Sequence, residues 1–267
     1  MMRLTLTGEC YGEAMGMAFS GEVAWVTGSS TGIGRAVAEA LAREGCRVAV
    51  YYNSSAEEAE QVVGRIEASG GEALLVGGDV SDAEEVKRMA GEVVERFGGV
   101  DILVNNAGSM LERRAFAEMT EDLWDRVMAV NLKSVYLCSQ AVLPVMKRQG
   151  GGRIVNITSV AARNGGGPGA AAYATAKGGV STLTRAMAKE LVSEGILVNG
   201  VAPGVITTPF HDRFTPPDVR ENLAKGIPIG REGTPEETAG VVVFLASSAA
   251  DYLVGEIIEV NGGQLMD

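Results

Sequence analysis

The octet Thr27-Gly28-Ser29-Ser30-Thr31-Gly32-Ile33-Gly34 decides how this chain folds. It follows an apolar run, Val23 to Thr27, and opens an amphipathic segment that continues to Glu44. Glycines here let the backbone turn sharply and let a pyrophosphate approach the amino terminus of a helix, where free N–H groups and the helix dipole attract anions. A glycine-rich turn alone is a weak signal. Its place directly after the first strand favours a dinucleotide-binding turn over a purely structural one.

Outward from the octet, short apolar runs alternate with longer amphipathic segments. The predicted strands are Val23 to Thr27, Arg47 to Tyr51, Ala73 to Gly77, Asp101 to Val104, Arg153 to Thr158, Ile196 to Val201 and Glu256 to Val260. The predicted helices after the first are Ala56 to Ala68 (with Ser55 and Glu58 as a capping box), Asp82 to Phe97, Glu121 to about Gln149, Ala172 to Ser193 and Pro235 to Ser247. This alternation predicts an α/β fold, a single doubly wound Rossmann-type domain whose seven-stranded parallel sheet carries helices on both faces.

The length of 267 residues suits one large domain, which we assign to residues 21–267. Residues 1–20 carry neither the charge cluster nor the long apolar stretch of a signal peptide, and we expect an N-terminal extension without a catalytic role. Met17 is a candidate natural start. Residues 205–232 hold four prolines among scattered charges and are too long for an ordinary connection, which predicts a substrate lid.

Charge and cysteine usage argue against several functions. With 23 basic and 34 acidic residues the net charge is −11, which opposes binding to a nucleic-acid backbone. No apolar run reaches the ~20 residues of a membrane span. Cys10, Cys46 and Cys138 form no CxxC pair, and with a single histidine they offer no metal-ligand spacing. The sequence therefore predicts a cytoplasmic protein with reduced thiols, no metal, and neither a membrane nor a nucleic-acid partner.

Tyr173 and Lys177 lie four residues apart on one predicted helix and so share a face. A free tyrosine, with a pKa of about 10, exchanges protons poorly near neutral pH, and an adjacent ammonium lowers that pKa. By spacing alone, an incidental pair remains the simpler interpretation. Ser159 ends a predicted strand, at the edge where open α/β sheets place ligands, and is either a hydrogen-bond donor to substrate or a turn residue. Asn131 lies inside a predicted helix, where asparagine needs a polar partner.

Together these motifs resemble those of the short-chain dehydrogenase/reductase superfamily. The octet is similar to its TGxxxGxG fingerprint, and Asn105-Asn106-Ala107-Gly108 to its NNAG motif. Asn131, Ser159, Tyr173 and Lys177 match its catalytic tetrad, and Pro203-Gly204 matches its PG turn. The resemblance covers Ser20 to the C-terminus. It implies an NAD(P)(H)-dependent oxidoreductase in which a hydride passes between nicotinamide and a carbonyl or alcohol carbon while Tyr173 exchanges the proton on the oxygen.

The resemblance also implies roles for further residues. The backbone of Asn131 would help to hold a water near Lys177, which completes a proton relay to solvent. The implied cofactor-binding residues are Gly28, Ser30, Thr31, Gly32, Ile33, Gly34, Asn53, Ser54, Asp79, Val80, Asn106, Ala107, Gly108, Tyr173, Lys177, Pro203, Gly204, Ile206 and Thr208. For Asp79, a plain helix-capping role is the alternative.

The end of the second strand bears on the choice of cofactor. An acid there would hold the ribose of NAD and repel a 2′-phosphate, and Tyr51-Tyr52-Asn53-Ser54-Ser55 contains none. Against a phosphate, the position directly before Gly32 is Thr31 and not Lys or Arg, and Glu57 and Glu58 lie in the first turn of the next helix. We expect a preference for NADP(H) over NAD(H).

The pattern is most similar to the 3-oxoacyl-[acyl-carrier-protein] reductase branch, which implies an acyl-thioester carbonyl substrate. Sugar and polyol dehydrogenases of the glucose 1-dehydrogenase type share nearly every motif and are the alternative. We expect Arg163 to Gly169 to line the substrate cleft with the lid, and Arg213 or Arg231 to meet a phosphopantetheine phosphate. His211 is interpreted as a surface residue.

Two other classes use this scaffold, cofactor-independent lyases such as halohydrin dehalogenases and nucleotide-sensing regulators. The first lose the glycine fingerprint and replace the catalytic lysine by arginine, and the second typically lose the Tyr/Lys pair. Both features are present here, which disfavours both classes. The resemblance further implies a homo-oligomer, most often a tetramer built from the helices that carry Asn131 and Tyr173 and from the C-terminal strand.

Overall fold

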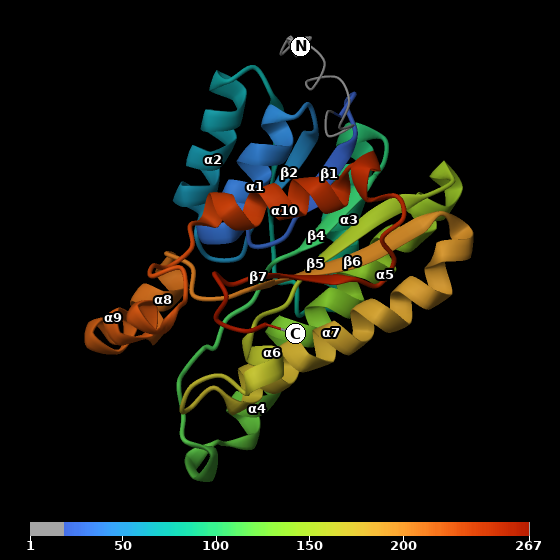
Figure 1. Cartoon of the computed structure of the whole chain (residues 1–267). Coiled ribbons are helices and arrows are strands. Elements are labelled where there is room, and N and C mark those ends of the chain that lie inside the picture. The colour runs from blue at the N-terminus through green and yellow to red at the C-terminus, as the bar shows by residue number, and fades with distance from the viewer. Residues whose placement is uncertain (1–18, 267) are drawn as a thin grey trace, which may run out of the picture.

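A parallel sheet of seven strands forms the centre of the protein, in the order β3-β2-β1-β4-β5-β6-β7 (Figure 1). The computed structural model describes residues 19–266, so Cys10, Met17 and nearly all of the predicted N-terminal extension lie outside the described residues. The strands are β1 (Val23–Val26), β2 (Arg47–Tyr52), β3 (Glu72–Gly77), β4 (Ile102–Asn105), β5 (Gly152–Ile157), β6 (Ile196–Pro203) and β7 (Ile257–Val260). Val26 pairs with Val50 of β2 on one side and with Val104 of β4 on the other. The strand order therefore reverses at β1, where the carboxyl ends of the strands leave a crevice for a ligand.

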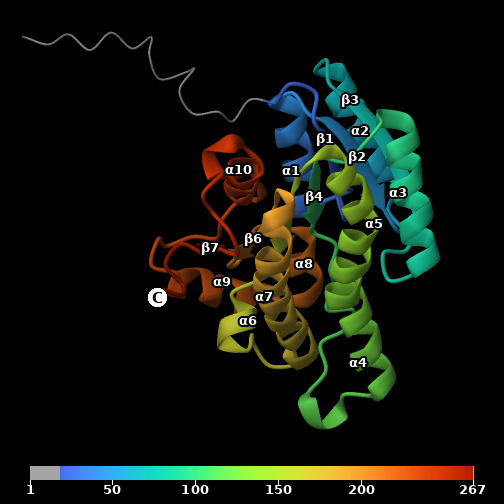
Figure 2. The same ribbon diagram turned by 90° about the vertical axis from the view of Figure 1, so that its right-hand side faces the viewer.

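Two layers of helices cover the sheet, because its strands are apolar on both faces. One layer consists of α1 (Gly32–Arg43), α2 (Ala56–Ala68) and α10 (Pro235–Ala246), and the other of α3 (Ala83–Phe97), α5 (Ser134–Gln149) and α7 (Ala171–Leu191) (Figure 2). Trp25 and Val26, neighbours on β1, enter the opposite cores. Short helices outside these layers are Phe116–Glu118, α6 (Ala161–Asn164), Val192–Glu194 and Ser248–Ala250. The predicted fold class and all predicted strands are confirmed, with small shifts at strand ends.

Three local predictions need correction. Ser55 makes no side-chain cap to α2, because its backbone (φ −101°, ψ 64°) is not in the extended conformation that a cap requires. The long helix predicted from Glu121 is interrupted, since a π-helical turn (Ala129–Lys133) separates α4 (Glu121–Met128) from α5. The proline-rich residues 205–232 contain α8 (Pro209–Phe214) and α9 (Pro217–Gly226). Both helices begin with proline, whose missing N–H is not needed at a first helical position.

Candidate active site

The octet forms the turn between β1 and α1. Gly28 and Gly32 have positive φ angles of 63° and 55°, which side chains rarely allow. A Cβ atom on Gly34 would lie 2.1 Å from the carbonyl oxygen of Gly28, and one on Gly28 would lie 2.9 Å from Cα of Ala107. Thr31 precedes α1 without a side-chain cap, so the first N–H groups of the helix are open to an anion. This closed turn fits a dinucleotide phosphate.

The NNAG motif fixes the shape of the glycine turn. Thr27 Oγ1 accepts hydrogen bonds from the N–H groups of Asn106 (2.9 Å) and Ala107 (3.0 Å). Asn106 Nδ2 donates in return to the carbonyl oxygens of Thr27 (2.9 Å) and Gly28 (3.0 Å). The two motifs therefore satisfy each other's polar groups, and the turn is shaped before any ligand binds.

A cavity of about 950 Å³ opens at this carboxyl edge of the sheet, within the ~300–1,000 Å³ that ligand sites occupy. The predicted site residues that line it are Gly28, Ser30, Thr31, Gly32, Ile33, Gly34, Asn53, Ser54, Val80, Asn106, Ala107, Gly108, Ser159, Tyr173, Lys177, Pro203, Gly204, Ile206 and Thr208. Asp79 and Asn131 do not line it. The cavity thus joins the amino terminus of α1 to Tyr173 and Lys177, which suits a cofactor with a phosphate near one end and a reactive ring at the other.

Tyr173 and Lys177 of α7 meet Ser159 in this cavity. Ser159 and Tyr173 are hydrogen-bonded through their hydroxyl groups, and Lys177 Nζ lies 5.8 Å from the centroid of the Tyr173 ring. Lys177 is buried, and its Nζ donates to the carbonyl oxygen of Ile157 (2.7 Å). The hydroxyl of Thr158 instead donates to the backbone carbonyl of Lys177 (3.0 Å), which separates it in role from Ser159.

Burial controls the proton affinities of the pair. It raises the pKa of Tyr173 to about 12, and the hydrogen bond from Ser159 opposes that rise. The pKa of Lys177 is lowered to about 8, because the buried ammonium loses its hydration. Burial therefore outweighs any lowering of the Tyr173 pKa in the protein alone, and the expectation that Lys177 lowers this pKa stays a prediction.

Asn131 lies in the π-helical turn and is fully buried. Its Oδ1 accepts from the N–H of Ser109 (3.1 Å), and its Nδ2 donates to the carbonyl oxygens of Ser109 (2.7 Å) and Val127 (2.8 Å). A Cβ atom on Gly108 would lie 2.7 Å from Asn131 Oδ1 and 3.3 Å from Lys177 Nζ. The side chain of Asn131 therefore anchors the loop behind the NNAG motif, beside Lys177.

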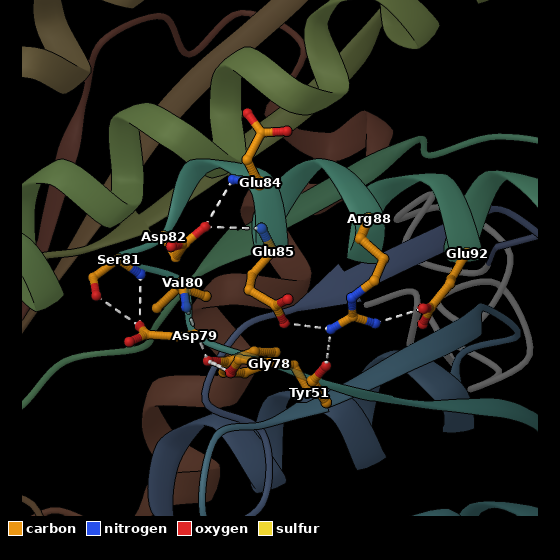
Figure 3. A network of polar contacts seen from close by, with 11 residues as sticks. Tyr51, Gly78, Asp79, Val80, Ser81, Asp82, Glu84, Glu85, Arg88 and Glu92 are labelled. Atoms are coloured by element: carbon orange, nitrogen blue, oxygen red, sulfur yellow. Dashed lines mark hydrogen bonds and ion pairs between the residues drawn. The ribbon is translucent and has the colours of Figure 1, made fainter.

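Asp79 stabilises a turn after β3. Its Oδ1 accepts from the N–H (2.8 Å) and the hydroxyl (2.7 Å) of Ser81 (Figure 3). Tyr51, which no sequence motif predicts as a site residue, holds the same segment. Its hydroxyl donates to the carbonyl oxygen of Gly78 (2.7 Å) and accepts from the N–H of Val80 (3.3 Å), as Figure 3 shows. Val80 is thereby kept at the cavity wall, while Asp79 is engaged in the turn.

Next to Tyr173, the cavity has an apolar wall. The ring centroid of Phe210 lies 5.5 Å from that of Tyr173 and 5.1 Å from that of Phe214. Met110 packs into the same cluster. None of the three is predicted as a site residue by the sequence motifs, although Phe210 and Phe214 recur at helical spacing directly after Pro209.

Charged and polar residues complete this wall. His211 lines the cavity, is half-buried and is hydrogen-bonded through Nδ1 to Thr215 Oγ1 (3.0 Å), so its interpretation as a surface residue without a catalytic role stays a prediction. Arg231 does not line it and is paired with Glu237 (2.7 Å). Arg213 does line it, and so does Arg113, which no sequence motif predicts as a site residue. The predicted cleft segment contributes Asn164, Gly166, Gly167 and Pro168.

Comparison with known proteins identifies the family. A family model described as enoyl-(acyl carrier protein) reductase matches residues 28–264. The 3-oxoacyl-[acyl-carrier-protein] reductase FabG of Staphylococcus aureus is 45% identical over 243 residues, which cover 91% of this chain and 98% of that protein. This chain belongs to the short-chain dehydrogenase/reductase family. It is therefore an NAD(P)(H)-dependent oxidoreductase that acts on carbonyl or CH–OH groups, as its glycine fingerprint and Tyr/Lys pair predict.

Solved structures of short-chain dehydrogenases/reductases agree with this fold. A 7α-hydroxysteroid dehydrogenase complexed with NADH and 7-oxoglycochenodeoxycholic acid is 35% identical, with a TM-score of 0.89 over 94% of this chain and 97% of that one. A candidate NAD(P)-dependent gluconate 5-dehydrogenase from Beutenbergia cavernae, with NADP bound at low occupancy, is 37% identical, with a TM-score of 0.88 over 93% and 98% of the two chains. Within residues 19–266, no helix is both long and apolar enough to cross a membrane.

Proposed function

We propose that this enzyme reduces the ketone of 3-oxoacyl thioesters with NADPH and uses Tyr173 as the proton donor. The observation that carries the proposal is the meeting of Tyr173, Ser159 and the buried Lys177 in a cavity whose other wall is the glycine turn. When bound, the nicotinamide supplies or accepts the hydride and, in its oxidised form, a positive charge that lowers the pKa of a nearby phenol. The 45% identity to a 3-oxoacyl-[acyl-carrier-protein] reductase supports a thioester substrate.

In this reaction Tyr173 gives its proton to the ketone oxygen, and Ser159 donates a hydrogen bond to the same oxygen. A phenol with a pKa of about 12 is fully protonated at neutral pH and is therefore available as an acid. Lys177, with a pKa of about 8, is mostly charged at neutral pH and stabilises the phenolate as it forms. Asn131 holds the loop beside Lys177, and the relay through its backbone and a water stays a prediction.

The end of β2 supports NADP(H) over NAD(H). Asn53, Ser54 and Ser55 line the cavity there, and the hydroxyl of Ser55 is not used to cap α2. Neutral hydroxyl and amide groups tolerate a 2′-phosphate that a carboxylate would repel. A fluorescence titration of the purified enzyme should show tighter binding of NADPH than of NADH. Binding of NADH about tenfold tighter than NADPH would contradict this preference.

The substrate class is tested by initial rates at the absorbance of the reduced nicotinamide. We expect kcat/KM for acetoacetyl-N-acetylcysteamine with NADPH to be higher, by about tenfold or more, than kcat/KM for gluconate or glucose with NADP⁺. A faster reaction with gluconate or glucose would favour the sugar and polyol branch, to which the gluconate 5-dehydrogenase neighbour points. No absorbance change across ketones and alcohols with either cofactor would contradict the proposed reaction.

We further propose a cytoplasmic homotetramer formed through α5, α7 and β7. Tyr136 on α5 and Tyr252 before β7 are exposed, as expected for residues that a partner copy covers. Cys46 and Cys138 are free thiols, which supports a reducing compartment such as the cytoplasm. Light scattering should give four times the chain mass, and a monomer would contradict the assembly. We assign residues 205–232 to a lid and expect removal of residues 1–16 to leave turnover unchanged.

A further inference from the structure

Arg113 is an unneutralised cation at the cavity wall of an acidic protein. Among residues 19–266, no carboxylate forms an ion pair with its guanidinium, whose hydrogen bonds go to backbone carbonyl groups. The other arginines of its loop and of α9 and the following turn are neutralised, Arg114 by Glu112, Arg220 by Glu232 and Arg231 by Glu237. Since acids outnumber bases 34 to 23, the absence of a partner for Arg113 does not follow from a shortage of carboxylates.

Two hydrogen bonds orient the Arg113 guanidinium. Nε donates to the carbonyl oxygen of Phe214 at the end of α8, and Nη1 donates to that of Pro168 (2.8 Å). A guanidinium has five N–H donors, so these bonds leave part of its planar fork unused. Leu111, in the same loop, is the one non-glycine residue within 19–266 that has a positive φ (56°), and its N–H donates to Ser109 Oγ (3.0 Å). This loop therefore presents Arg113 in a fixed orientation, which reduces the entropy lost on binding.

An apolar path leads from Tyr173 to Arg113. The ring of Tyr173 lies 5.5 Å from that of Phe210, which lies 5.1 Å from that of Phe214, whose carbonyl oxygen holds Arg113. Arg213 lies over the ring of Phe214 (5.1 Å) and adds a second positive charge. A substrate with its ketone at Tyr173 would thus cross an aromatic surface before it meets a guanidinium fork, which matches the geometry of carboxylate and phosphate groups.

We propose that Arg113 is a specificity-determining residue that binds an anionic oxygen group, a carboxylate or a phosphate, which the substrate carries at a distance from its ketone, beyond the part that lies along Phe210 and Phe214. The inference rests on the proposed function, because it concerns the substrate of the same cavity. It replaces the expected role of Arg231, which Glu237 neutralises. A purely structural Arg113, which ties α8 to the loop at Pro168, would affect charged and uncharged substrates equally.

Ketone pairs that differ in one charge test this inference with NADPH as reductant. The carboxylate pair is 7-oxooctanoate and its methyl ester, and the phosphate pair is acetoacetyl-4′-phosphopantetheine and acetoacetyl-pantetheine. The kcat/KM of each is measured for wild type, Arg113→Met, Arg113→Lys and Arg114→Met. Arg114→Met is the matched control, since Arg114 is the next residue, pairs with Glu112 and does not line the cavity. Circular dichroism and NADPH titration establish that each variant is folded.

We expect wild type to prefer the charged member of one pair by about tenfold. Arg113→Met should abolish that preference, Arg113→Lys should retain part of it, and Arg114→Met should leave it unchanged. The pair that shows the preference identifies the anion. If Arg113→Met lowers kcat/KM equally for both members of each pair, or if wild type shows no preference, the inference is overturned. Neither result would contradict ketone reduction as the proposed function. A wild-type enzyme that reduces none of the four ketones would overturn the proposed function as well.

Discussion

The two walls of the cavity are held together in different ways. At the nucleotide wall, Thr27 and Ser29 are buried, and backbone groups of the turn are bonded to the NNAG motif. At the substrate wall, α9 contributes no buried residue, and Phe214 is the one buried residue of α8. Segments with few buried contacts open at low free energy. Rigidity is therefore concentrated where the cofactor fits, and α9, the least buried part of the substrate wall, has the freedom to open.

Charge pairing adds to the sparse packing of α8 and α9. Arg220 of α9 donates through Nε (2.6 Å) and Nη2 (2.7 Å) to Glu232, and it also contacts Asp212 of α8. Glu232 in turn accepts from Thr207 Oγ1 (2.9 Å). One arginine thus ties both lid helices to the two ends of the lid. Substitutions at Tyr173 and Lys177, and then on each wall, test this difference between the two walls.

Tyr173→Phe removes the proposed acid at the meeting point of the two walls and has the largest expected effect. Without a proton donor, kcat should fall by about 10²–10⁴-fold. The dissociation constant of NADPH should change little, because the glycine turn does not depend on this hydroxyl. Stopped-flow turnover and fluorescence titration give the two values. Turnover near the wild-type rate would assign the proton to another group.

Lys177→Met should lower kcat by about 10²-fold and yet stabilise the fold at neutral pH. The pKa of Lys177 is about 8 in the folded protein and 10.5 ordinarily. Between these two pH values the unfolded chain binds more protons than the folded protein. The free energy of unfolding of wild type therefore rises with pH, because Lys177 loses the charge whose burial destabilises the fold. Urea unfolding should therefore give the variant a higher free energy of unfolding than wild type at pH 7. This difference should disappear by about pH 10.5. A constant difference between the two proteins across this range would contradict burial as the cause of the pKa shift.

Gly34→Ala and Gly226→Ala make the same change on the two walls. A Cβ on Gly34 would lie 2.1 Å from a backbone oxygen, whereas one on Gly226, at the end of α9, meets nothing within 4 Å. We expect Gly34→Ala to cost about 2–4 kcal/mol of unfolding free energy and to abolish NADPH binding. Gly226→Ala should stay within about 0.5 kcal/mol of wild type or gain slightly. Equal effects in urea unfolding would refute the contrast between the walls.

Arg220→Met should have the smallest effect on catalysis. Loss of the ties to Glu232 and Asp212 lets the lid open more often, so the KM for ketone should rise about three- to tenfold while kcat and NADPH affinity hold. Hydrogen exchange should accelerate in α8 and α9 and stay unchanged in β1 and α1. Unchanged exchange in the lid helices would show that packing alone holds them.

Sequence patterns predicted the parts of the molecule that have local causes. The strands are continuous in apolar residues, and the glycine turn follows from backbone conformations that only glycine adopts freely. The prolines that open α8 and α9 are a local signal for the start of a helix, but the prediction for this segment was a long lid without helices. The π-helical turn at Asn131 and the placement of Arg113 depend on tertiary contacts. Neither the helix composition nor the spacing of residues 109–115 reveals them.

The ionisation of Tyr173 tests the central claim most directly. Phenolate absorbance is titrated in wild type and in Tyr173→Phe, and the difference isolates this one group. The protein alone should give an apparent pKa of about 12, because the surrounding protein takes hydration from the phenolate. Saturating NADP⁺ should move that pKa down by about two units or more, because a cation beside the phenol stabilises the phenolate. An identical pKa with and without NADP⁺ would contradict the assignment of Tyr173 as the residue that exchanges its proton next to the nicotinamide.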